Sequence, residues 1–169
     1  MSYVTSIEEV LWGIALVAIT MAIHGTGMVA TLYTSEVLKR PERAPPHFRG
    51  GTILIVASWM IVLIHLSELL VWAAFFVWQD ALPSPSTAYY FALMQYTTVG
   101  SSFNLPLRWR LLEGMLPIAG LMTFAWSTGV LFTLAQEFQS AQLSLLRGRG
   151  AERKSLKQRR AASGQAGES

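Results

Sequence analysis

The chain has 169 residues, of which 52% are hydrophobic and 14% are charged, and its formal net charge is +3. This composition is typical of a membrane protein. The chain contains no cysteine, which excludes a disulfide framework, a thiolate metal site and a cysteine nucleophile.

Three apolar runs are long enough to span a bilayer, which needs about 20 residues. They cover residues 10–33, 52–78 and 111–135, while a fourth run, 86–97, is too short to cross. The flank of the first run carries Glu8 and Glu9 but no Lys or Arg. We therefore interpret this run as a retained transmembrane helix and not as a secretory signal.

The basic residues predict the orientation of the chain, because Lys and Arg in short loops stay in the cytoplasm. Only two lie between the second and third long runs, whereas the loop after the first run and the C-terminal tail are rich in them: Lys39, Arg40, Arg43 and Arg49 in the loop, and Arg147, Arg149, Arg153, Lys154, Lys157, Arg159 and Arg160 in the tail. This pattern predicts an external N-terminus and a cytoplasmic C-terminus.

Three regions follow from this pattern. Residues 1–51 form the first helix and a basic cytoplasmic loop, residues 52–138 form a central module, and residues 139–169 form a basic tail. The tail has little apolar content to bury, so we expect it to be disordered. It either attracts anionic lipids or serves only as a topology signal. We expect no nucleic-acid binding, because no aromatic residues lie among its basic ones.

The short run begins after Pro83-Ser84-Pro85, where Ser86 or Thr87 can cap a helix over residues 88–96. A segment that enters the membrane without crossing must satisfy its backbone groups with protein or with a water-filled cavity. The negative end of its dipole then favours a cation. A re-entrant helix is the expected structure.

The sequence Thr97-Thr98-Val99-Gly100 follows this helix. If the chain returns with its carbonyl groups turned to one side, alternate residues need left-handed backbone angles, which glycine accepts most easily. Gly100 supplies one such position. The next one is expected two residues later, where Ser102 stands.

In this setting the chain resembles the two-helix pore module of potassium channels, with one helix added before it. The resemblance covers about residues 65–138 and depends on four segments: Tyr89-Tyr90-Phe91, Tyr96-Thr97-Thr98-Val99-Gly100, Leu105-Pro106-Leu107-Arg108-Trp109-Arg110-Leu111-Leu112-Glu113 and Phe124-Ala125-Trp126-Ser127-Thr128. It implies an all-α integral membrane fold with three transmembrane helices, one re-entrant pore helix and a filter loop. It also implies a homotetramer around a central pore in a prokaryotic inner membrane.

The resemblance also assigns roles to residues. The ion pathway would be lined by Thr97, Thr98, Val99, Gly100, Ser101 and Ser102. Gly120 falls where the inner helix of such channels has a hinge, and Pro117 makes a bend there easier.

Ser101, Ser102 and Phe103 stand where the family has Tyr, Gly and Asp. Selectivity depends on the number and arrangement of the coordinating layers. We therefore expect a passive cation pore that discriminates weakly between K⁺ and Na⁺, with no resident cofactor or metal. The alternative is a non-conducting or regulatory membrane subunit that keeps the channel fold. No constellation typical of an enzyme is present.

Three ionisable residues lie at membrane depth, namely His24, His65 and Glu68. The histidines could ligate haem in an electron-transfer protein. They could form a proton-sensing site. Finally, all three could join the helices in a satisfied polar network behind the pore helix.

Glu113 begins the third long helix and also has two interpretations. Its carboxylate suits the positive end of the helix dipole. It could instead attract cations to the outer mouth of the pore, although Arg108 and Arg110 are close enough in sequence to neutralise it.

Overall fold

The computed structural model describes residues 4–39 and 46–165. Its regular elements are all helical: α1 (Ile7–Lys39), α2 (Pro46–Trp78), α3 (Pro85–Tyr96), the 3-10 helix η1 (Leu107–Trp109) and α4 (Leu112–Gln165). Three segments are long and apolar enough to cross a membrane, Ile7–Lys39, Gly50–Trp78 and Leu107–Gly148. The prediction of an all-α membrane protein with three spans and one short intervening helix is confirmed.

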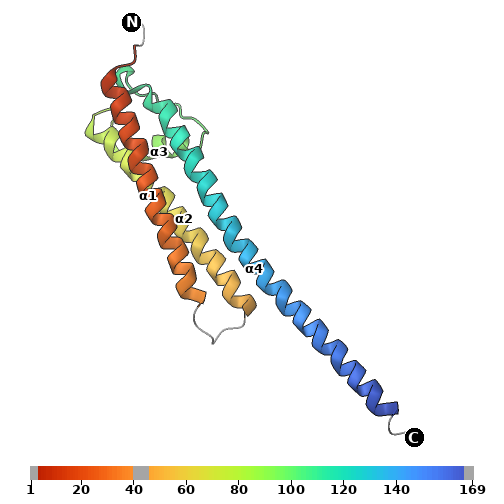
Figure 1. Ribbon diagram of the computed structural model, residues 1–169. Coiled ribbons are helices and arrows are strands. Elements are labelled where there is room, and N and C mark those ends of the chain that lie inside the picture. Colours follow the sequence, from red (N-terminus) through yellow and green to blue (C-terminus); the bar gives the residue numbers. More distant parts are fainter. Residues whose placement is uncertain (1–3, 40–45, 166–169) are drawn as a thin grey trace.

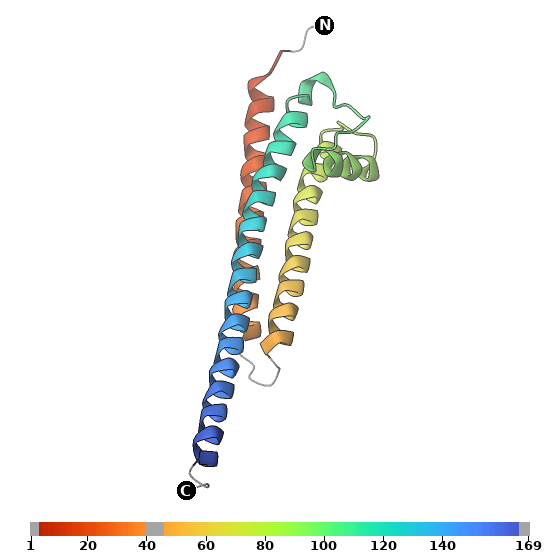
Figure 2. The same ribbon diagram turned by 90° about the vertical axis from the view of Figure 1, so that its right-hand side faces the viewer.

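The three long helices lie side by side in one bundle (Figure 1). α1 packs against both α2 and α4. The short helix α3 lies nearly crosswise to them at one end of the bundle (Figure 2), where it packs against α2 and α4. α3 and the loop after it thus occupy the end of the bundle near the N-terminus.

α4 continues as a helix well past the ends of α1 and α2 (Figure 1). This differs from the disordered tail predicted for residues 139–169, of which 166–169 lie outside the described residues. The physical reason is composition, because Gln, Ala, Leu, Arg and Lys are all good helix formers. A polar segment that extends an existing helix also avoids the unfavourable nucleation step.

The N-cap of α3 lies two residues before Ser86, the earlier of the two expected caps. Ser84 is the N-cap, and its Oγ accepts a hydrogen bond from the backbone N–H of Thr87 at 3.1 Å. Pro85 then occupies the first turn, where its missing N–H costs nothing. The expected caps, Ser86 and Thr87, therefore lie inside the helix. From this start, α3 buries Phe91 and Tyr96 completely against the bundle.

Two acidic residues at the start of α1 hold it to the segment that precedes α4. The backbone N–H of Leu111 donates to the carboxylate of Glu9, which is 1% exposed. The guanidinium of Arg108 donates to Glu8 at 2.7 Å. The first helix is therefore attached to the same end of the bundle that carries α3 and its loop.

Candidate functional site

The loop after α3 folds back over the last turn of that helix. The N–H of Thr97 donates to the carbonyl of Leu93 at 3.1 Å, and the N–H of Gly100 donates to the carbonyl of Met94 at 3.0 Å. The first part of the loop is thereby fixed to the C-terminal end of α3.

Two residues in this loop have left-handed backbone angles, Thr98 with φ 62° and Gly100 with φ 85°. Thr98 and Asp80 are the non-glycine residues with positive φ in the described part of the chain. The alternation expected at Gly100 and Ser102 is not found, because Ser102 has no positive φ. Thr98, two residues before Gly100, has one instead. Since β-branched residues adopt this conformation at a cost, the angle at Thr98 is a strained feature.

The loop is open to one side. The side chain of Val99 is 69% exposed and that of Phe103 is 44% exposed. A Cβ atom added at Gly100 would meet nothing within 4 Å. One copy of the chain therefore leaves the apolar residues of this loop uncovered.

The return from the loop to α4 is held by the side chain of Glu113. Its carboxylate accepts a hydrogen bond from the backbone N–H of Leu105. Trp109, four residues before Glu113, is buried. The guanidinium of Arg108 lies over its ring, 4.9 Å from the ring centroid. Glu113 thus anchors the loop backbone at the first turn of α4.

A buried polar cluster lies behind the loop. We define it as the side chains of six residues from all four helices: His24 of α1, His65 and Glu68 of α2, Tyr96 of α3, and Thr123 and Ser127 of α4. His24 Nδ1 lies 2.8 Å from Glu68 Oε1, and both side chains are completely buried. The sequence placed His24, His65 and Glu68 at similar depth, and the structure brings them together.

Tyr96, the last residue of α3, is the centre of this cluster. Its hydroxyl donates to Glu68 Oε2 and lies 2.5 Å from Thr123 Oγ1 and 2.9 Å from His65 Nδ1. The residue that closes the short helix is therefore bound to α2 and α4. Thr97, the first residue of the loop, follows it directly.

Ser127 closes the other side of the cluster. Its Oγ lies 3.1 Å from His65 Nε2 and 3.2 Å from His24 Nε2, and its hydroxyl donates to the carbonyl of Thr123 at 2.9 Å. Within the described residues, no buried side-chain nitrogen or oxygen lacks a hydrogen-bond partner. This geometry fits two of the three interpretations of His24, His65 and Glu68, the polar network and the proton-sensing site.

By residue type, His24, His65 and Glu68 could hold a metal ion, because their ligand atoms lie within 4.8 Å of one another. However, each of these atoms already has a protein partner. A haem is a poorer fit still, since the two imidazole ring centroids lie only 5.2 Å apart in tilted planes and no ring nitrogen faces open space. The donor set is complete without either group.

Gly120 lies where α4 meets the end of α3. A Cβ atom at this position would overlap the carbonyl oxygen of Tyr96. Pro117 lies inside α4, one turn earlier. The glycine that the family resemblance marks as a hinge is thus also a point of close packing, and its role in gating stays a prediction.

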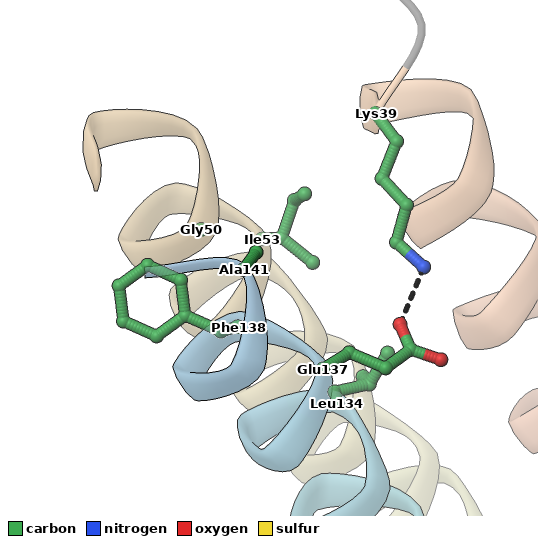
Figure 3. A pocket seen from close by; sticks show the side chains of 7 residues that line it. All are labelled: Lys39, Gly50, Ile53, Leu134, Glu137, Phe138 and Ala141. Atoms are coloured by element: carbon green, nitrogen blue, oxygen red, sulfur yellow. Dashed lines mark hydrogen bonds and ion pairs between the residues drawn. The ribbon is translucent and has the colours of Figure 1, made fainter. Parts of the chain in front are cut away.

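A separate cavity of about 380 Å³ lies at the opposite end of the bundle, between the end of α1, the start of α2 and the middle of α4 (Figure 3). Lys39 Nζ reaches Glu137 Oε2 across its rim at 2.6 Å. The ring of Phe138 lies against Gly50, where a side chain would overlap it. None of the predicted site residues lines this cavity.

No protein-family model, curated protein or solved structure matches this chain. The site therefore has to be interpreted from its own geometry. Tyr96, Thr123 and Ser127 were not predicted as members of a site. A signal for the last two exists in the sequence, because hydroxyl residues four apart in an apolar helix share one face.

Proposed function

We propose that this membrane protein is a passive cation channel in which residues 97–102 line the narrowest part of a pore. One observation carries the proposal: a helix of 12 residues, too short to span a bilayer, is followed by an open loop with left-handed angles at Thr98 and Gly100. Alternation of this kind turns successive main-chain carbonyls to one side, where they can replace the water around an ion.

The burial pattern supports a pore over a purely structural loop. In a membrane, irregular backbone is tolerated only where protein covers it or where it lines a water-filled path. Val99 and Phe103 are exposed in one copy of the chain, so further copies or a water-filled axis have to face them. The C-terminal end of α3 points its negative dipole to the same place, which favours a cation.

We propose a homotetramer, because one copy has too few helices to enclose a path. The face of α4 that carries Ile118, Leu121 and Met122 is exposed in a single chain, and it would face the axis or a neighbouring copy. In this assembly the N-terminus is external, and the basic residues of the tail lie beside anionic lipids of the cytoplasmic leaflet.

The filter is shorter than that of the potassium channels it resembles. The left-handed pair supports coordination layers near Thr98, Val99 and Gly100, whereas Ser101 and Ser102 offer no further glycine. Fewer layers discriminate less between ions of similar size. We therefore propose weak selectivity between K⁺ and Na⁺.

Reconstitution of the purified protein into planar bilayers tests this function. We expect currents whose reversal potential follows the cation gradient, with a K⁺ to Na⁺ permeability ratio near one. Gly100→Ala, which forces a Cβ onto a residue with φ 85°, should reduce the current severely. Gly51→Ala is the matched control, since a Cβ there meets nothing within 4 Å and the residue lies in α2, away from the loop.

Two results would contradict the proposal. An intact oligomer that passes no current in any monovalent salt would favour the alternative, a non-conducting subunit with the same fold. A permeability ratio as high as that of a selective potassium channel would refute weak selectivity.

A further inference from the structure

We propose that the buried polar cluster is a proton-binding site, which holds one exchangeable proton among His24, Glu68 and His65 and couples it to the loop through Tyr96. The site itself does not depend on ion conduction. Its coupling to the loop rests on the proposed channel function.

Without this proton, the cluster has too few hydrogen atoms to make a hydrogen bond between every pair of polar atoms that lie close enough for one. Six pairs lie at hydrogen-bond distance: His24 Nδ1–Glu68 Oε1, His24 Nε2–Ser127 Oγ, His65 Nε2–Ser127 Oγ, His65 Nδ1–Tyr96 Oη, Tyr96 Oη–Glu68 Oε2 and Tyr96 Oη–Thr123 Oγ1. Two neutral imidazoles and one phenol supply three hydrogens, and an ionised carboxylate supplies none. Even with both aliphatic hydroxyls turned inward, five hydrogens serve six pairs.

The hydroxyls also have partners elsewhere. Ser127 donates to the carbonyl of Thr123 at 2.9 Å, and Thr123 donates to the carbonyl of Gly120 at 2.9 Å. At least one added proton is therefore needed if every pair is to be a hydrogen bond. Without it, lone pairs would face each other in a buried site, which is costly.

Charge limits the number of added protons to one. With Glu68 ionised and both histidines neutral, the cluster carries one negative charge on a completely buried side chain, and an unpaired charge at membrane depth is strongly unfavourable. One bound proton makes the cluster neutral, whether it resides on the carboxyl group or on an imidazole. A second proton would make it positive.

Among the residues that the structure describes, Glu68 forms ion pairs only with His24 and His65. His24 is the titratable group that α1 directs at Glu68, α2 adds His65 and α3 adds Tyr96. α4 contributes only hydroxyls, since it has no charged residue between Glu113 and Glu137. The remaining charged residues of α1 lie near its ends: Glu8, Glu9, Glu36 and Lys39.

Tyr96 connects the proton to the loop. Its hydroxyl bonds Glu68, and its main chain ends α3 immediately before Thr97. When the proton leaves, Glu68 and both histidines become acceptors or single donors, and the pairs around the Tyr96 hydroxyl have to rearrange. We expect deprotonation to loosen the end of α3 and reduce the population of the conducting loop.

Equilibrium unfolding of the full chain in mixed detergent micelles tests proton binding without any current. The unfolded chain releases this proton above about pH 6.5, the ordinary value for histidine. The proposed site keeps it in the folded chain, so stability should fall as pH rises above 7 until the site releases its proton. Below about pH 6.5 the two histidines of the cluster bind two protons in the unfolded chain against one in the folded site, so stability should fall there as well. We expect the unfolding equilibrium constant to rise about tenfold per pH unit above pH 7.

Glu68→Gln is the decisive variant, because its amide brings its own hydrogens and no charge. Its stability should be independent of pH between 7 and 9, whereas Glu8→Gln, at an exposed site, should keep the wild-type slope. A flat wild-type profile, or a Glu68→Gln profile as steep as that of the wild type, would overturn the proton site.

If Glu68→Gln does not fold, ¹⁵N NMR of the histidine rings in the wild-type protein decides instead. We expect the ring nitrogens of His24 and His65 to change together above pH 7, and no change there would overturn the site. In bilayers, open probability should fall as pH rises in the wild type but not in Glu68→Gln. A pH-independent wild-type current would refute the coupling to the loop, while absence of current would count against the channel function alone.

Discussion

The α-carbon of Gly120 packs so closely against the carbonyl oxygen of Tyr96 that a Cβ atom would overlap it. This contact joins the middle of α4 to the end of α3, at the point where the loop begins. It gives Gly120 a packing role that holds in a single chain. Any hinge motion at this residue would have to preserve or break this contact.

Gly120→Ala should therefore destabilise the protein. The added methyl group meets backbone, which cannot move away as a flexible side chain could, so we expect a loss of about 1–3 kcal/mol. Gly129→Ala in the same helix meets open space and should be neutral or slightly stabilising, because Ala favours helices. Unfolding midpoints of the two variants provide the comparison, and equal midpoints would argue against the packing role.

Tyr96→Phe should remove the centre of the buried polar cluster while preserving the ring. Glu68 and Thr123 would each lose the hydroxyl partner they have in the structure. Leaving buried polar atoms unpaired costs about 1–3 kcal/mol, which chemical unfolding would detect. Tyr90→Phe, on the same helix and 48% exposed, should change stability little. A loss of the same size in both variants would show that the cluster contributes nothing specific.

Glu9→Ala and Glu8→Ala should differ although the two residues are adjacent. Glu9 is buried and accepts the N–H of Leu111, just before α4. Its removal leaves this partly buried N–H without its acceptor, which costs about 1–3 kcal/mol. Glu8 pairs with Arg108 at the surface, where such pairs contribute about 1 kcal/mol or less. The midpoint temperature of thermal unfolding should be clearly lower for Glu9→Ala than for Glu8→Ala. The reverse order would contradict the attachment of α1 through Glu9.

Two substitutions at Glu113 distinguish its role as an anchor of the loop backbone from a role in attracting cations. Gln keeps an oxygen that can accept the N–H of Leu105 but removes the charge, whereas Ala removes both. Because the carboxylate anchors backbone, we expect Glu113→Gln to keep most of the conductance at low salt and Glu113→Ala to lose stability. A large loss of conductance in Glu113→Gln, abolished by high salt, would instead indicate steering of cations.

Much of the fold could be predicted because uninterrupted apolar runs determine where a chain can cross a bilayer. The run predicted over 52–78 ends at Trp78, as α2 does, and the short run over 86–97 corresponds to α3 (Pro85–Tyr96). The ends were harder to predict, since polar residues continue α4 to Gln165. Hydropathy indicates which part of a helix lies in the membrane, but it does not indicate where the helix ends outside it.

The candidate site could be predicted only in part. The left-handed angle at Gly100 follows from residue type alone, whereas Thr98 adopts one because the loop is bonded to the last turn of α3. His24, His65 and Glu68 stood out as ionisable residues in apolar runs. The spacing of Thr123 and Ser127 puts both hydroxyls on one face of α4. Which residues that face meets depends on how α3 and α4 cross α2, and no local pattern contains that information.

The measurement that tests the channel most directly is an electron cryo-microscopy map of the purified full chain in K⁺. The proposed function predicts four copies around one axis, with ion density on that axis beside the carbonyls of Thr98 and Gly100. A monomer or dimer, or a tetramer whose loops at 97–102 turn away from the axis, would contradict it.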